Sequence, residues 1–282
     1  MWPRHTGDFS MFRIYADANS APADYSESNV PYKPQHYLPV SLAGTQAGDF
    51  TMVFGFPGST DEYMPATELE LMVGQWNPAK IELRTKAIEL MVEAMKGDEQ
   101  IKIQYASTQA GLSNSWKKWI GIGQRIEFTK AIEKKRVREE QFQKAVATNR
   151  RFDARYKTLL PNYDMLYGQW SPTVMARDYY FETCFRAMGS TYFIYRLRDL
   201  EEKLQAEGAE AEMSSALVEA AGHFKDYNDE LERTLFVEMM QYYVDHVNSE
   251  MRAPELNGWN AEKALELFND SYFTSEERFN DL

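Results

Sequence analysis

The sequence predicts an α+β protein in which a β-rich segment, residues 1–76, precedes a large helical region, residues 77–282. Short aromatic and apolar runs separated by turn residues fill roughly the first 70 positions, a pattern typical of an antiparallel sheet or barrel. From about Asn77 onward, apolar residues recur at intervals of three and four, which indicates helices. The sequence contains no internal repeat. The change of period therefore predicts one β part followed by one helical part.

The β-rich segment contains three candidate strands. They are the runs 8–15, 38–42 and 48–58, and the stretch 16–34 between the first two is rich in Asp, Asn, Ser and Pro. The third run is bounded by glycines and ends in a Pro-Gly turn. Strands joined by such loops, without intervening helices, favour antiparallel pairing.

The helical region begins with an Asn77-Pro78 pair, which predicts an N-cap followed by a proline at the first helical position. We expect this helix to end near Gly97. A long charged helix is expected from 116 to 157 with a break near Gly121–Gly123, and another helix is expected to start at Ser171-Pro172 and run towards Leu204. Further helical segments are expected from Asp98, over 211–248 and over 260–268.

Composition excludes several classes of function. The chain has 282 residues, and 31 basic against 43 acidic side chains give a net charge of −12, which argues against a general nucleic-acid-binding protein. No apolar run approaches the roughly 18 residues that a membrane-spanning helix needs. Cys184 is the single cysteine, so an intrachain disulfide is impossible. We therefore expect no nucleic-acid partner and no membrane span.

One stretch departs from the acidic average. Lys117 to Lys157 holds 13 basic and 5 acidic residues. The acids alternate with the bases on a helical pattern, which favours a solvated helix face. A surface that binds an anion or a partner is the second interpretation.

The sequence contains no established metal-binding motif and no nucleotide-binding loop. Several acidic residues and histidines lie near one another on expected helices, but their spacing matches no metal site. They are Glu219, His223, Glu238, Asp245, His246 and Glu250. We therefore expect no metal and no cofactor, and we interpret these side chains as parts of solvated helix faces.

The start of the chain carries the most informative pattern. Asp8 opens a short apolar strand, and about forty residues later a second strand follows with the pattern Gly48-Asp49-aromatic-apolar-Gly-x-Pro-Gly. This pairing resembles the first barrel of chymotrypsin-fold serine proteases, in which the triad aspartate heads such a strand and orients a histidine. The local pattern alone equally allows a turn residue before a strand.

Longer strings identify a family. The strings 2–13, 30–34, 48–58, 77–80 and 113–119 resemble, in order, those of the bacterial dipeptidyl-peptidases of types 7 and 11, serine peptidase family forty-six. The resemblance implies a chymotrypsin-like fold with a helical domain inserted between two β-barrels. Residues 1–76 would then form part of a barrel, which accounts for the change of period near Asn77.

The resemblance also implies roles for individual residues. It makes Asp8 the triad aspartate and Asn114 the helical-domain group that binds the free α-amino group of a peptide substrate. Trp2 and Arg4 are expected to pack around Asp8 or to touch the substrate, whereas His5 belongs to the aspartate block and is not expected to be the catalytic base. The alternative for Asn114 is a helix N-cap before Trp116.

Two blocks of the family are missing from this chain. The strings that carry the catalytic histidine and the Gly-Asn-Ser-Gly-Ser nucleophile are absent. We therefore expect an internal piece of a longer enzyme, inactive by itself, because loss of the serine or the histidine from a triad costs on the order of a millionfold in kcat. The resemblance further implies a complete enzyme in the periplasm or at the cell surface that forms a homodimer. The alternatives are a non-catalytic helical binding module and, third, a metal-dependent helical bundle.

Overall fold

The computed structural model describes residues 10–52, 55, 61, 63–199, 202 and 209–281. Its contacts divide the chain into unit 1, Met1–Thr60, and unit 2, Asp61–Leu282. The boundary lies before residue 76, and helical structure starts at Ala66 rather than at Asn77. Residues 66–76 are therefore helical, although the sequence pattern groups them with the β-rich segment.

Unit 1 contains one short antiparallel ladder. Strand β1, Tyr15–Ala16, pairs with strand β2, Val30–Pro31, in a register that places Tyr15 opposite Pro31. The carboxylate of Asp17 accepts two backbone N–H bonds in the turn that follows β1. Ala16 is the single buried apolar residue among the described positions of unit 1.

The longer strands expected in this segment are not formed over the described residues. Of the run 8–15 only its last residue is in a strand, the run 38–42 holds no strand, and neither do residues 48–52. Residues 8–9, 53–54 and 56–58 of these runs lie outside the described residues. A strand is held by hydrogen bonds to a neighbouring strand, and most of the described part of unit 1 has no such neighbour. Antiparallel pairing is present, but the part of unit 1 that the structure describes forms no barrel.

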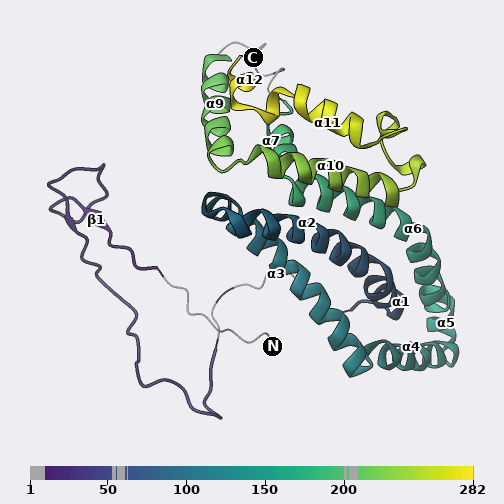
Figure 1. Ribbon diagram of the computed structural model, residues 1–282. Helices are drawn as coiled ribbons and strands as arrows, with labels where there is room; N and C mark the ends of the chain where they lie inside the picture. The colour runs from purple at the N-terminus through teal and green to yellow at the C-terminus, as the bar shows by residue number, and fades with distance from the viewer. Residues whose placement is uncertain are drawn as a thin grey trace. The chain divides into compact units, whose positions relative to one another are not determined.

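Unit 2 is helical (Figure 1). Its first half consists of α1 (Ala66–Leu71), the π-helical turn η1 (Met72–Trp76), α2 (Asn77–Gly97), α3 (Glu99–Thr129), α4 (Ala131–Ala147), α5 (Arg150–Tyr156) and α6 (Leu159–Phe181). Its second half consists of the π-helical turn η2 (Glu182–Ala187), α7 (Gly189–Arg196), α9 (Ala209–Lys225), α10 (Asp229–His246), η3 (Ser249–Met251), η4 (Pro254–Leu256), α11 (Ala261–Asp270), η5 (Tyr272–Thr274) and α12 (Glu276–Asn280).

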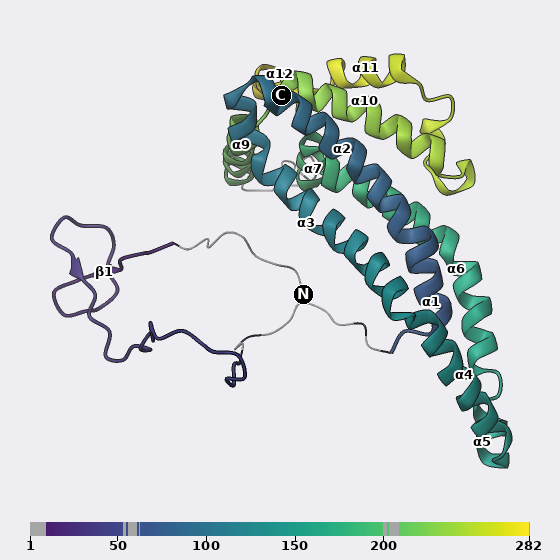
Figure 2. The ribbon, with the colours of Figure 1, turned by 60° about the horizontal axis from the view of Figure 1, so that its bottom comes forward.

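Helices α2 and α3 form an antiparallel pair, in which α2 lies between α3 and α10 (Figures 1 and 2). The main core lies where α10 and η2 pack against α2 and where α11 packs on α10, and Leu83, Met91, Leu235, Met239 and Phe268 are fully buried there. A second, smaller core joins α7, α9 and α12. Burial of apolar surface in these two cores is what holds the helices together.

The expected N-cap at Asn77 is wrong. Asn77 is buried and has helical backbone angles, because α1, η1 and α2 form one continuous rod. A proline inside a helix lacks an N–H group and its ring clashes with the carbonyl four residues earlier. The wider π-helical turn directly before Asn77-Pro78 changes that hydrogen-bond pattern and so lets the rod continue through Pro78.

The expected break near Gly121–Gly123 is also wrong, since α3 runs unbroken from Glu99 to Thr129. The chain turns instead at Lys130, which has a φ of 50° and lies in the left-handed region between α3 and α4. A glycine costs a helix only about 1 kcal/mol relative to alanine, which the packing of α3 against α2 outweighs.

The helix start expected at Ser171-Pro172 lies inside α6. The hydroxyl group of Ser171 caps no helix, because it accepts a hydrogen bond from Trp76 Nε1 at 2.9 Å and donates one to Gln75 Oε1 at 3.2 Å. Ser171 therefore joins α6 to the rod that contains η1. Among the described helices, none is both long and apolar enough to cross a membrane.

Candidate substrate-binding site

The structure tests the placement of only one of the four site residues predicted from the sequence. Trp2, Arg4 and Asp8 lie outside the described residues, as does His5. Asn114 lies in the middle of α3 and its side chain is exposed. The alternative role for Asn114 as an N-cap is wrong, because Asp98 caps α3 by accepting hydrogen bonds from the N–H groups of the second and third helical residues, at 2.7 and 3.2 Å.

The face of α3 opposite to Asn114 packs on α2. Leu112, Trp116 and Trp119 are spaced four and three residues apart, so they lie on one side of the helix. Trp116 Nε1 donates a hydrogen bond of 2.8 Å to Thr85 Oγ1 on α2. Asn114, two residues after Leu112, is turned by about 200° from it, which agrees with its exposure to solvent.

Two ion pairs join α2 to the end of α6 and to η2. Lys80 and Arg84, four residues apart on α2, face Asp178 and Glu182, which are also four residues apart. Lys80 Nζ lies 3.1 Å from Asp178 Oδ2. The Trp119 ring covers both cations, with its centroid 4.8 Å from Lys80 Nζ and 4.5 Å from Arg84 Cζ, in cation–π geometry.

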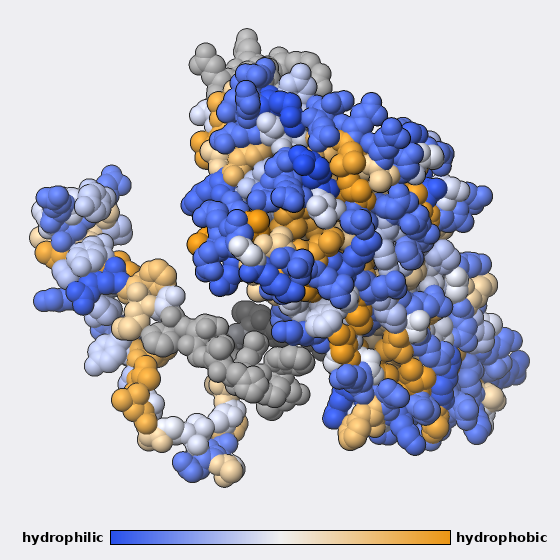
Figure 3. All heavy atoms as spheres, viewed as in Figure 1, coloured by the Kyte–Doolittle hydropathy of each residue, from blue (hydrophilic) through white to orange (hydrophobic). Residues whose placement is uncertain are grey.

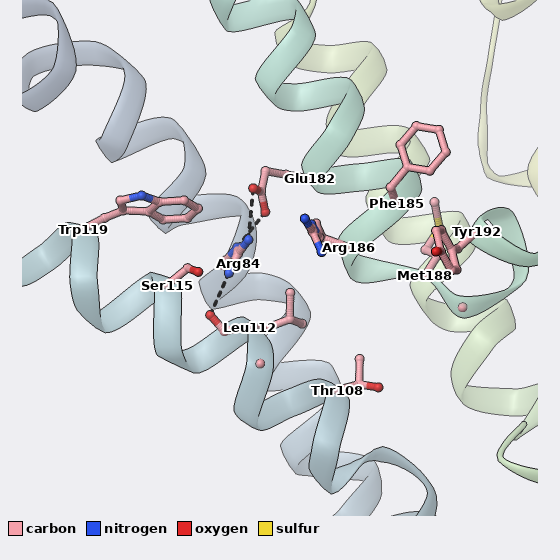
Figure 4. A pocket seen from close by; sticks show the side chains of 12 residues that line it. Arg84, Thr108, Leu112, Ser115, Trp119, Glu182, Phe185, Arg186, Met188 and Tyr192 are labelled. Atoms are coloured by element: carbon pink, nitrogen blue, oxygen red, sulfur yellow. Dashed lines mark hydrogen bonds and ion pairs between the residues drawn. The ribbon is translucent and has the colours of Figure 1, made fainter. Parts of the chain in front are cut away.

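Arg84 makes the most connected contact of this group (Figure 4). Its Nε and Nη2 donate to the two carboxylate oxygens of Glu182 at 2.6 and 3.0 Å, and its Nη1 donates to the backbone carbonyl of Leu112 at 2.9 Å. Both charged side chains are buried, with exposed fractions of 5% and 8%. A buried charge is tolerated when it is paired and hydrogen-bonded in this way.

A cavity of about 580 Å³ lies beside this ion pair, between α2, α3, η2 and the start of α7. Its wall combines the aromatic rings of Trp119, Phe185 and Tyr192 with the hydroxyl groups of Thr108 and Ser115. A volume in this range suits a small ligand or a peptide side chain.

Arg186 also lines the cavity and projects near Glu182 (Figure 4). It makes no ion pair with any described residue, so the cavity carries one uncompensated positive charge. Asn114 precedes a lining residue, Ser115, in the chain but does not itself line the cavity.

The other acidic residues and histidines named in the sequence are engaged in local contacts. Glu219 pairs with Arg196 at 2.6 Å, and His223 stacks on Phe193 with ring centroids 4.3 Å apart. His246 Nδ1 lies 2.8 Å from a backbone carbonyl, and Asp245 accepts a hydrogen bond at 2.8 Å. Within the described ranges, no three such side chains come together as a metal site would require.

Cys184, on η2, is half-buried and packs against the main core. Burial raises the pKa of its thiol to about 12. The thiol is therefore protonated at neutral pH, which suits apolar packing rather than a nucleophilic role.

The basic stretch from Lys117 to Lys157 lies on α3, α4 and α5, and most of its charged side chains are exposed. Arg136, the best connected, pairs with Glu70 at 2.7 Å and with Glu139 at 3.3 Å. The pairing is typical of a solvated helix face, the first of the two interpretations given above.

Comparison with known proteins decides the family. The family model described as Peptidase S46 matches residues 1–282. The chain belongs to this family. The resemblance found in the short strings is thereby confirmed along the whole sequence.

The relatives within the family are dipeptidyl-peptidases. The chain is 41% identical to the Asp/Glu-specific dipeptidyl-peptidase of Flavobacterium psychrophilum, over 86% of this chain and 34% of that protein. It is 36% identical to the enzyme of the same name from Capnocytophaga gingivalis (98% and 39%) and 34% identical to dipeptidyl-peptidase 7 of Phocaeicola vulgatus (88% and 34%). The chain thus spans between a third and two fifths of the length of these relatives.

A solved structure of the family is also similar. The crystal structure of Porphyromonas endodontalis DPP11 in complex with the dipeptide Arg-Glu matches with a TM-score of 0.77 and 27% identity, over 99% of this chain and 41% of that one. The complex of the same enzyme with the dipeptide Arg-Asp matches with a TM-score of 0.74. The similar solved structure is thus that of a protein with a dipeptide bound.

The sequence alone did not identify Arg84, Glu182 and Arg186. The available signal was a pair of complementary spacings, Lys80 with Arg84 and Asp178 with Glu182, each four residues apart on an expected helix. Nothing in the sequence says which two helices lie side by side, so that signal could not be used.

Proposed function

We propose that this chain is part of a longer serine dipeptidyl-peptidase that releases dipeptides from the free N-terminus of oligopeptides through an acyl-enzyme intermediate. The observation that carries the proposal is the family match over the whole chain together with relatives named as dipeptidyl-peptidases. In this proposal Asp8 orients the catalytic histidine, Trp2 and Arg4 support it, and the histidine and the serine are supplied by other parts of the longer protein. No cofactor takes part.

The proposed architecture follows the family. Residues 1–76 belong to a chymotrypsin-like barrel that other segments complete, and residues 77–282 belong to a helical domain inserted into it. The exposed apolar side chains of unit 1 support this assignment, since they need a partner surface (Figure 3). Periplasmic or cell-surface location and a homodimer are further parts of the proposal.

The gene sequence on both sides of this chain tests the proposal first. We expect a histidine block upstream and a Gly-Asn-Ser-Gly-Ser block downstream, and dipeptidyl-peptidase activity in the complete protein but none in residues 1–282 alone. If neither block is present, or if residues 1–282 hydrolyse dipeptidyl substrates above a blank, the proposal is wrong. If both blocks are absent, the remaining candidate is a non-catalytic helical binding module.

Asn114 is proposed to bind the α-ammonium group of the substrate through its amide oxygen. The position supports this role, because the side chain is exposed and held on a long, well-anchored helix. A hydrogen bond to a charged group contributes about 1.5–3 kcal/mol. In the complete enzyme, Asn114→Ala should lower the preference for free over N-acetylated substrates, measured as the ratio of their kcat/KM values, by about 10- to 150-fold.

Gln124→Ala is the matched control for this variant. Gln124 is an exposed amide on the same helix, ten residues further on. We expect the control to keep the preference of the unmodified enzyme. An unchanged preference in Asn114→Ala itself excludes Asn114 from amine recognition.

A further inference from the structure

The rotation of α3 about its own axis decides where Asn114 lies. With side chains a helix is about 10–12 Å across, so a rotation of about 20° displaces a surface side chain by about 2 Å. Misplacement by about 1 Å at a binding or reacting group can cost about a hundredfold in rate. A long helix that carries a recognition residue on its outer face therefore needs a contact on its inner face that fixes the rotation.

Arg84 supplies such a contact. Inside a helix, a backbone carbonyl normally accepts one hydrogen bond, from the N–H group four residues later, and has a second lone pair left over. The carbonyl of Leu112 uses that lone pair to accept the 2.9 Å hydrogen bond from Arg84 Nη1. This contact is made to the backbone of α3 only two residues before Asn114.

The guanidinium group of Arg84 is itself held in place. Its planar fork donates to both oxygens of Glu182, at 2.6 and 3.0 Å, and the Trp119 ring covers it at 4.5 Å. The pair is buried, so bulk water competes little for these donors. Figure 4 shows how the fork joins η2 on one side to α3 on the other.

We propose that Arg84 is a positioning residue for substrate recognition: by bridging Glu182 and the Leu112 carbonyl it fixes the rotation of α3 and thereby the place of Asn114. The inference rests on the role proposed above for Asn114. Arg84 also lines the cavity described above, and in this proposal it acts through the helix rather than by contact with the substrate.

The adjacent ion pair provides the matched control. Lys80 also pairs with an acid across the same interface and also lies under Trp119, but no hydrogen bond to the α3 backbone is formed by it within the described residues. Lys80→Met should keep the preference of the complete enzyme for free over N-acetylated substrates. Arg84→Met should lower that preference by about tenfold or more, chiefly through a higher KM for the free substrate.

A charge exchange separates positioning from simple stabilisation, in case Arg84→Met does not fold. The variant Arg84→Glu with Glu182→Arg keeps the ion pair, but a carboxylate at position 84 cannot donate to the Leu112 carbonyl. We expect this variant to unfold at a temperature closer to that of the unmodified enzyme than Arg84→Met does, and to keep the lowered preference. Full recovery of the preference in the exchanged variant, or an equal loss in Lys80→Met, overturns the inference.

A double-mutant comparison keeps the two proposals apart. If Arg84 acts through Asn114, Arg84→Met should lower the preference much less in an enzyme that already carries Asn114→Ala. An equal loss in both backgrounds means that Arg84 acts by another route. If Asn114→Ala alone leaves the substrate preference unchanged, the proposed role of Asn114 is wrong. If Asn114→Ala lowers the preference and the Arg84 variants do not, only the inference about Arg84 is wrong.

Discussion

His223, on α9, is held as a neutral imidazole by its surroundings. Its ring stacks on Phe193 and contacts Phe224 and Tyr227, and its Nε2 atom is buried without a hydrogen-bond partner among the described atoms. Burial lowers the pKa of His223 from 6.5 to about 4. As the pH falls from about 6.5 to about 4, His223 becomes protonated in the unfolded chain but stays neutral in the folded chain. The free energy of unfolding therefore decreases over this range.

Replacing His223 by phenylalanine should remove this acid sensitivity. The aromatic stack on Phe193 is kept, and the group that takes up the proton on unfolding is lost. We expect the free energy of unfolding, measured by urea denaturation between pH 4 and 7, to fall less steeply with acid in His223→Phe than in the unmodified chain. His36, which is exposed in unit 1, is the matched control, and His36→Phe should leave the pH dependence unchanged.

The test compares the two variants, because the pH dependence of the free energy of unfolding also contains a contribution from Glu232. This contribution has the opposite sign to that of His223. This fully buried carboxyl accepts hydrogen bonds from Tyr105 and from the N–H groups of Gly189 and Ser190. Burial raises its pKa, so its contribution to stability is complete below about pH 4.5 and decreases as the pH rises. An identical pH profile in His223→Phe and the unmodified chain refutes the assignment to His223.

A functional residue can be found from the sequence when a short string around it identifies it, but not when its role depends on residues far away in the chain. Asn114 is exposed on a helix, as a binding residue must be, and the string around it is specific enough to identify the family. Arg84 could not be found in this way, because its role arises from Glu182, about a hundred positions away in the chain, and from a backbone carbonyl on a third helix. Contacts of this kind depend on packing between helices, which a single sequence does not specify.

At the scale of the elements, the position of the glycines in α3 allows a direct test of the helix. Gly123 lies inside α3, and a Cβ atom added there meets no other atom within 4 Å. Since glycine costs a helix about 0.5–1 kcal/mol relative to alanine, Gly123→Ala should raise the free energy of unfolding by about that amount. Chemical denaturation followed by circular dichroism measures the change. A decrease would instead support the helix break that the sequence pattern favours.

Gly189→Ala is the contrasting variant. Gly189 is the first residue of α7, and a Cβ atom there would lie 3.2 Å from Glu232 Oε1, closer than ordinary van der Waals contact. We expect this variant to lower the free energy of unfolding, because the carboxyl that caps α7 would have to move. The two glycines thus have opposite predicted effects although both lie in helices.

The helices themselves were predictable, but several of their ends were not. Periodicity correctly indicated helical structure from Asn77 onward, and Gly97 does end α2. The proline and glycine residues predicted helix boundaries at Asn77-Pro78, Gly121–Gly123 and Ser171-Pro172, and all three predictions are wrong. At each of these places the chain continues as a helix because π-helical turns or contacts with neighbouring helices outweigh the local preference.

At the scale of the whole molecule, the two units differ in how much they bury. Both hydrophobic cores are built from residues after 65, whereas most large apolar side chains of unit 1 are exposed. Residues 61–282 should therefore fold without unit 1. We expect this shorter chain to keep the helical circular dichroism signal of unit 2 and to unfold at the same temperature as residues 1–282 within about 2 °C.

The complementary piece serves as the control. Residues 1–60 alone should show no cooperative thermal transition, because the one short ladder and single buried alanine among their described positions cannot offset the loss of chain entropy. A clearly lower unfolding temperature of residues 61–282 would contradict the independence of unit 2. The sequence pattern predicts three strands in this segment, whereas its described residues form one short ladder.

The described residues of unit 1 bury almost no apolar surface, and this affects how the protein is made. Unit 1 leaves the ribosome before unit 2, and residues 61–282 follow over about 10–45 s at about 5–20 residues per second. During that time the helical unit can complete its own folding, while side chains such as Phe12, Leu42 and Phe50 stay open to other molecules. These exposed side chains are thus made before the unit that folds on its own, and the interval before they are covered is when newly made chains are most exposed to aggregation and most in need of a chaperone.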